Sequence, residues 1–195
     1  MPNKEITRAD LLDFDEYLAV RKERKSLISG IKKNRRISVG PDATFYFESF
    51  DTMLHQIQEM LYIERGGEEQ VDDELNAYNS LIPNGKELVA TLMFEIDNVQ
   101  RRTEFLSRLG GVEKKIKLVL NDEVIDGVPE LDIERTNESG KTSSIHFIHF
   151  PLNESQSKKF KDLKTSVTLG IDHEKYGHIA QIPDIFQEAL SKDLD

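Results

Sequence analysis

The chain has 195 residues, of which 37% are hydrophobic and 32% are charged, whereas a typical globular domain has about 45–50% and about 25%. It contains no cysteine, which excludes a disulfide framework, thiolate metal ligands and a cysteine nucleophile. No stretch resembles a signal peptide or approaches the roughly 18 apolar residues of a membrane-spanning helix, so we expect a soluble, cytoplasmic protein with no membrane contact.

The net charge of −10 is unevenly distributed. The segment from Arg21 to Arg36 contains eight basic residues and one acidic residue, for a local charge of +7, which leaves −17 on the rest of the chain. This segment could meet phosphates or an acidic partner, but the remainder of the molecule would repel a polyanion. We therefore interpret it as a solvated helix face and do not expect nucleic-acid binding.

The first half of the chain is dominated by helical periodicity. Thr7 followed by Asp10 resembles a capping box, which predicts a first helix reaching about Leu18. The next expected elements are a helix over 21–34, a hairpin of strands 36–39 and 43–49, two helices over 51–65 and 68–81, a buried strand over 88–96 and a helix over 97–109.

The second half of the chain consists mostly of expected strands. They lie at 116–120, 144–150, 165–171 and 177–182, with short helices near 154–163 and after Pro183, and with a loop over 134–142. Early helices and late strands favour an α+β fold over alternating βαβ units. We expect a single domain, residues 1–195, with an antiparallel or mixed sheet of about five to seven strands and helices mainly on one face.

Two histidines are candidates for metal binding. His173 and His178 are five residues apart, which excludes the helical spacing of a zinc protease. If the residues between them form a hairpin turn, the two imidazoles face each other about 5 Å apart and could bind one metal ion, with an ordinary cross-strand pair as the alternative.

The helix expected over 51–65 carries a polar stripe beside its apolar face. His55, Glu59 and Tyr62 recur at helical spacing, with Gln56 next to them. Such a stripe could line a polar cavity, hold a cation or bind a partner, and a solvated amphipathic helix is the alternative. If Glu59 is buried among amides its pKa is expected to rise, whereas a metal would keep it ionised.

Several segments resemble the bacterial family known as domain of unknown function 3501. They are 6–11, 35–41, 47–52, 56–60 and 74–83, and the last of these reads Glu-Leu-Asn-Ala-Tyr-Asn-Ser-Leu-Ile-Pro. The resemblance implies a short stand-alone protein associated with redox or iron chemistry. It directs attention to one polar site that would comprise Gln56, Gln58, Glu59, Glu74, Tyr78 and Asn79.

Two functional hypotheses follow. The first is a non-catalytic accessory module that binds a protein partner or a small ligand through the 51–82 helices, because no complete catalytic constellation is visible. The second is an enzyme or redox accessory that binds a divalent metal (iron, manganese or zinc) through Glu59, Glu64, Glu74 and a histidine. We favour the first, and the sequence is compatible with a homo-oligomer under either hypothesis.

Overall fold

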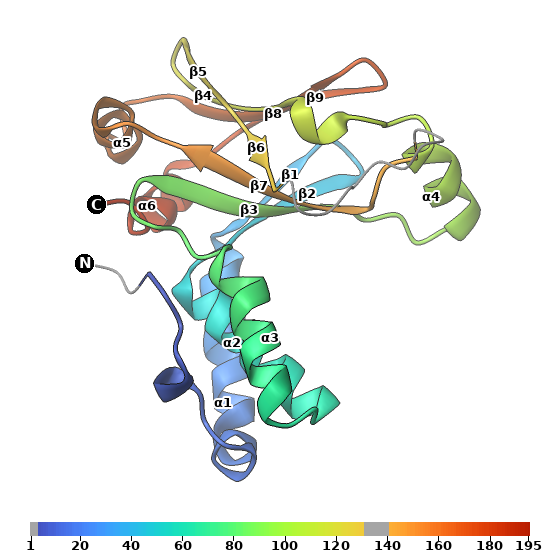
Figure 1. Ribbon diagram of the computed structural model, residues 1–195. Coiled ribbons are helices and arrows are strands. Elements are labelled where there is room, and N and C mark those ends of the chain that lie inside the picture. Colours follow the sequence, from blue (N-terminus) through green and yellow to red (C-terminus); the bar gives the residue numbers. More distant parts are fainter. Residues whose placement is uncertain (1–3, 131–140) are drawn as a thin grey trace.

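The computed structural model describes residues 4–130 and 141–195 and has an α+β architecture of two facing sheets and a group of helices (Figure 1). The strands are β1 (Arg36–Val39), β2 (Ala43–Phe47), β3 (Glu87–Phe94), β4 (Ile116–Leu120), β5 (Glu123–Asp126), β6 (Val128–Pro129), β7 (Ile145–Pro151), β8 (Val167–His173) and β9 (Tyr176–Gln181). The α-helices are α1 (Phe14–Lys33), α2 (Phe50–Glu64), α3 (Glu68–Asn79), α4 (Val99–Leu106), α5 (Glu154–Lys161) and α6 (Asp184–Ser191), with short 3₁₀ turns at Arg8–Asp10 and Val112–Lys114.

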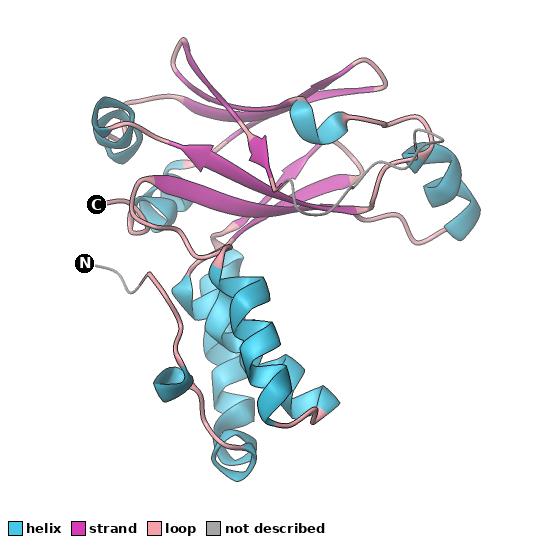
Figure 2. Cartoon of the chain, viewed as in Figure 1, coloured by secondary structure: helices cyan, strands magenta, loops and turns pink. Residues whose placement is uncertain are grey.

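All strand pairs are antiparallel. One sheet has the order β1-β2-β3-β7-β6 and the other has the order β5-β4-β8-β9. The expected α+β class is therefore confirmed, and the structure adds that the strands are divided between two sheets. The separation into sheets and helices is visible in Figure 2.

The main core lies between the two sheets. Phe45 and Leu92 of the five-stranded sheet belong to the same buried cluster as Leu118 and Leu169 of the four-stranded sheet. Burial alternates along β2, β4 and β8, as expected for strands with one face in a core. Every second residue of β2 therefore points to the outer side of the five-stranded sheet.

Helices α1, α2 and α3 project from that outer side, and we call these three helices the helical arm (Figure 1). Helix α2 lies between the other two and packs against both. Its base is joined to the sheet by a second buried cluster, in which Ile57 packs with Leu81 and with Val89 of β3. The helical arm and the outer face of β1–β3 therefore border each other.

The prediction of two separate helices with a break near residue 20 is wrong. Thr7 and Asp10 do form the capping box, but it supports only a 3₁₀ turn that ends at Leu11. A second capping box, between Asp13 and Glu16, starts one continuous helix that runs to Lys33. No residue between positions 18 and 21 interrupts it, because alanine and valine there are compatible with a helix.

The remaining expected elements are present with boundaries shifted by a few residues. The short strands β5 and β6 were not expected, because two to four residues are too few to show a clear alternation. Most of the loop expected over 134–142 lies outside the described residues. Across the described ranges, none of the helices combines the length and apolar character needed to cross a bilayer.

Candidate functional site

The six polar residues expected to form one site do not all come together. Gln58 and Asn79 each hold the segment that precedes α1. The side-chain amide of Gln58 accepts a hydrogen bond from Leu12 N (2.9 Å) and donates one to Leu12 O (2.9 Å). The side-chain amide of Asn79 likewise accepts a hydrogen bond from Ile6 N (2.8 Å) and donates one to Ile6 O (2.9 Å). Both amides are therefore occupied by main-chain groups of this chain.

Glu59 points toward α1, on another side of α2. Its carboxylate accepts hydrogen bonds from Arg21 Nε (2.7 Å) and Nη2 (2.9 Å) and from the Tyr17 hydroxyl (2.7 Å). Lys25 Nζ lies 3.0 Å from the same carboxylate. The hydrogen bonds from Arg21, followed by those from Tyr17 and Lys25, lower the pKa of Glu59 to about 2. The condition for a raised pKa, burial of Glu59 among amides, is not met, because its side-chain partners are two cations and a tyrosine hydroxyl.

Glu64 and Glu74 do not join Glu59. Both accept a hydrogen bond from Gln70 Nε2, at 2.9 and 3.1 Å respectively. Within residues 4–130 and 141–195, no three histidine, aspartate or glutamate side chains are grouped closely enough to hold a metal ion. The metal-binding hypothesis stays a prediction, and the placement of these three carboxylates does not support it.

The two candidate histidines at the β8–β9 hairpin do not face each other directly. The register pairs His173 with Tyr176 and His178 with Ile171, because the turn contains only two residues. The histidines are thus diagonal neighbours, a relation that separates Cα atoms by about 7–8 Å. The His178 ring packs against the Tyr176 ring, with centroids 4.4 Å apart. A role for the pair in metal binding stays a prediction.

Burial raises the pKa of Tyr78, and the Gln56 side chain near it opposes that rise. Gln56 also lines a cavity of about 260 Å³ that lies between α2, the end of α1 and the outer face of β1–β3. We call it the arm–sheet cavity. Its lining comprises Lys32, Arg35, Arg36, Tyr46, Phe47, Glu48, Thr52, Met53, Gln56 and Met93.

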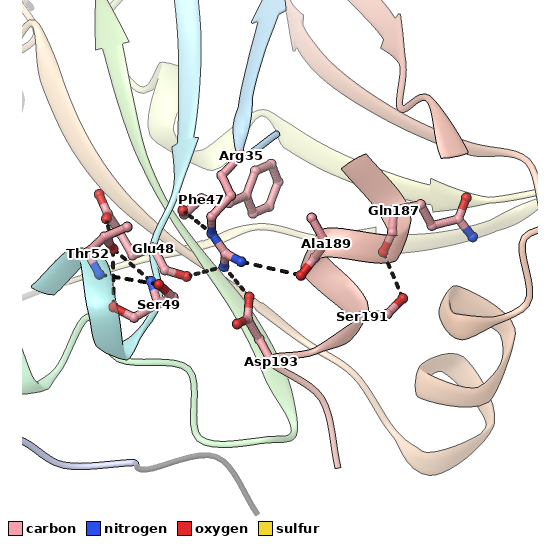
Figure 3. Close-up of polar contacts among 9 residues, drawn as sticks. All are labelled: Arg35, Phe47, Glu48, Ser49, Thr52, Gln187, Ala189, Ser191 and Asp193. Atoms are coloured by element: carbon pink, nitrogen blue, oxygen red, sulfur yellow. Dashed lines mark hydrogen bonds and ion pairs between the residues drawn. The ribbon is translucent and has the colours of Figure 1, made fainter. Parts of the chain in front are cut away.

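Glu48 is the most unusual residue of the arm–sheet cavity. It is only 7% exposed, and its carboxylate accepts hydrogen bonds from the hydroxyls of Thr52 and Thr91, both at 2.7 Å. Arg35 donates to the main-chain oxygen of Glu48 (2.7 Å), but its ion pair is with Asp193 (Figure 3). In the described part of the chain, the Glu48 carboxylate forms no ion pair.

Two cationic side chains border the same cavity. Lys32 belongs to the last turn of α1, and Arg36 begins β1 with its guanidinium 5.0 Å from the centre of the Tyr46 ring. Neither forms an ion pair with any carboxylate among the described residues. The cavity therefore combines one buried negative group and two positive groups that do not neutralise one another by direct contact.

Of the residues around this cavity, Gln56 alone is among the site residues expected from the sequence. Glu48 lies inside a segment that resembles the family, and its position alternates with the buried Phe45 and Phe47, so the strand pattern could have placed it on the outer face. Thr91 is a polar residue within an apolar strand, which was a second available signal. No local signal placed Lys32 beside them.

Comparisons with known proteins identify relatives but no activity. A family model described as "Protein of unknown function (DUF3501)" matches residues 5–194. The chain is similar to a solved crystal structure of a novel protein of unknown function from Burkholderia pseudomallei, with a TM-score of 0.90 and 35% identity over 97% of this chain and 99% of the other. No curated protein matches the chain.

Proposed function

The chain belongs to the DUF3501 family of proteins of unknown function, and from its own geometry we propose that it is a non-catalytic module that binds a small amine-bearing ligand in the arm–sheet cavity. One observation carries the proposal: the Glu48 carboxylate is buried at this cavity with two neutral hydrogen-bond donors and, among the described residues, no ion pair.

A buried carboxylate is unfavourable unless it is paired or fully hydrogen-bonded. The two threonine hydroxyls each occupy one acceptor position, whereas an ionised carboxylate offers about four. A ligand ammonium group supplies both the missing positive charge and further donors. It also forms charge-assisted hydrogen bonds, which are about twice as strong as neutral ones.

The other walls of the arm–sheet cavity support binding. Met53 and Met93 offer thioether surface that adapts to an apolar ligand chain, and Gln56 adds an amide. Among the described residues that line the cavity there is no histidine, cysteine or serine. These features favour retention of a ligand over its chemical conversion.

The test is isothermal titration calorimetry with primary amines, with and without a carboxylate, using n-butylamine and L-norvaline as probes. We expect the wild-type protein to bind at least one of them and the Glu48→Gln variant to lose at least about tenfold in affinity. The substitution preserves the shape of the side chain, so unfolding curves should confirm that the variant is folded.

Glu23→Gln is the matched control, because Glu23 is exposed on α1 and away from the cavity. It should bind as the wild-type protein does. The proposal is overturned if neither probe binds the wild-type protein at millimolar concentration, or if Glu48→Gln binds both probes unchanged.

A further inference from the structure

We infer that the ligand of the arm–sheet cavity is a small zwitterion of the α-amino-acid type, whose carboxylate is bound by Lys32 and Arg36 while its ammonium group is bound by Glu48. This inference rests on the proposed function and adds the second half of the ligand. It follows from the opposite charges that border one cavity without pairing with each other.

The three charged groups come from separate elements around one space. Lys32 ends α1, Arg36 begins β1, and Glu48 follows the last residue of β2. A ligand in the cavity can therefore meet one carboxylate and two cations that come from different elements. A volume of about 260 Å³ is large enough for a small amino acid, with its side chain against Met53 and Met93.

Ligands with charge of only one sign fit this cavity less well. Lys32 and Arg36 would repel a simple amine or diamine, and Glu48 would repel a carboxylate or phosphate. Like-charge contact is costly in a partly dehydrated site, so these repulsions also provide specificity. A molecule that carries both charges can pair with the carboxylate and with the cations.

The position of Arg36 is restrained, which favours recognition of an anion. Its guanidinium lies over the Tyr46 ring, whose hydroxyl donates to Glu95 (2.6 Å). A stacked guanidinium loses less freedom when it binds a carboxylate than a free one does. Lys32, which is half-buried and lines the same cavity, adds a second positive charge.

The experiment uses three molecules that share one carbon chain. L-Norvaline carries both charged groups, n-butylamine lacks its carboxylate, and pentanoic acid lacks its ammonium group. We expect calorimetry on the full-length wild-type protein to show that L-norvaline binds at least about tenfold more tightly than either of the others. Lys32→Met and Arg36→Met should each reduce the affinity for L-norvaline at least about fivefold without reducing the affinity for n-butylamine.

The matched control is Lys33→Met, because Lys33 is the exposed neighbour of Lys32 and does not line the cavity. It should leave the affinity for L-norvaline unchanged. Equal affinity for n-butylamine and L-norvaline would overturn the inference of a zwitterionic ligand but would still support an amine-binding site. Binding of neither, or of pentanoic acid alone, overturns both.

Discussion

Two glutamates of the helical arm and its junction with the sheet show how neighbouring side chains set the chemistry of a carboxylate. Glu59 lies among Arg21, Lys25 and Tyr17, so its charge is compensated within the protein. Glu48 is more deeply buried, and within residues 4–130 and 141–195 only two threonine hydroxyls donate to its carboxylate. The first arrangement stabilises α1 against α2, and the second leaves capacity for a ligand.

The contribution of Glu59 is predicted to depend on pH. The pKa of Glu59 is about 2 in the folded protein, below its ordinary value of 4.5. The stability that the ionised carboxylate contributes is therefore fully present above pH 4.5 and is lost as the pH falls toward 2. At pH 7, Glu59→Gln should lower the free energy of unfolding by about 1–3 kcal/mol. This range lies between the cost of breaking an exposed ion pair and the cost of breaking a buried one.

Urea unfolding of the wild-type protein and of Glu59→Gln, followed from pH 7 to pH 3, measures this effect. The difference between the two proteins should shrink across that range. Glu23→Gln, on the exposed face of α1, should change stability by less than about 0.5 kcal/mol. A difference that is as large at pH 3 as at pH 7 would contradict the assignment.

At the scale of elements, the segment before α1 is held to the helical arm by two side-chain amides. Gln58 binds both main-chain groups of Leu12, and Asn79 binds both main-chain groups of Ile6. Each amide replaces the partner that a neighbouring strand would supply. A segment whose regular structure is limited to the short 3₁₀ turn at Arg8–Asp10 is therefore kept in a defined position.

Removing either amide is predicted to release one end of the segment. Gln58→Met should strip hydrogen-exchange protection from the Leu12 amide and spare that of Ile6, whereas Asn79→Leu should do the reverse. Each substitution leaves two main-chain groups without partners and should cost about 1–3 kcal/mol. Exchange measured by NMR or mass spectrometry tests this.

The control for both variants is Gln100→Met, which alters an exposed glutamine on α4 far from the segment. The main-chain N–H groups of Ile6 and Leu12 should keep their wild-type exchange rates in that variant. Uniform loss of protection at Ile6 and Leu12 in either variant would show that the segment is released as one unit and that the two amides do not act separately.

At the scale of the whole molecule, Arg35 joins parts of the chain that are distant in sequence. Its guanidinium donates to the main-chain oxygens of Phe47 (3.0 Å), Glu48 (2.7 Å) and Ala189 (3.4 Å) and forms a buried ion pair with Asp193 (Figure 3). The first two oxygens lie where β2 leads into α2, and the other two partners lie at the C-terminal helix. One side chain therefore fastens α6 to the base of the helical arm.

Replacing Arg35 is predicted to have a large effect on stability. Arg35→Met leaves the Asp193 carboxylate buried without its cation, and breaking one side of a buried pair typically costs about 3–5 kcal/mol. Arg8→Met, which removes exposed pairs with Glu68 and Asp72, should cost less than about 1 kcal/mol. Urea unfolding measures both, and a similar small cost for the two variants would contradict the role of Arg35.

Local chemistry in the sequence determined most of the elements. The helix from Phe50 to Glu64, the hairpin around Gly40 and the buried strand β3 all followed from caps, turn residues and apolar periodicity. These signals act between residues a few positions apart, so they can be read without knowing the fold. The family resemblance and the α+β class were likewise available from the sequence.

Tertiary structure alone decided which polar side chains meet. Gln58 and Glu59 are adjacent in sequence, yet one binds Leu12 and the other binds Arg21, because successive residues of a helix point about 100° apart. The hydrogen bond from Thr91 to Glu48 joins residues 43 positions apart. Periodicity could place each of these residues on a face, but only the packing of the helical arm on the sheet brought Glu48 and Lys32 to the same cavity.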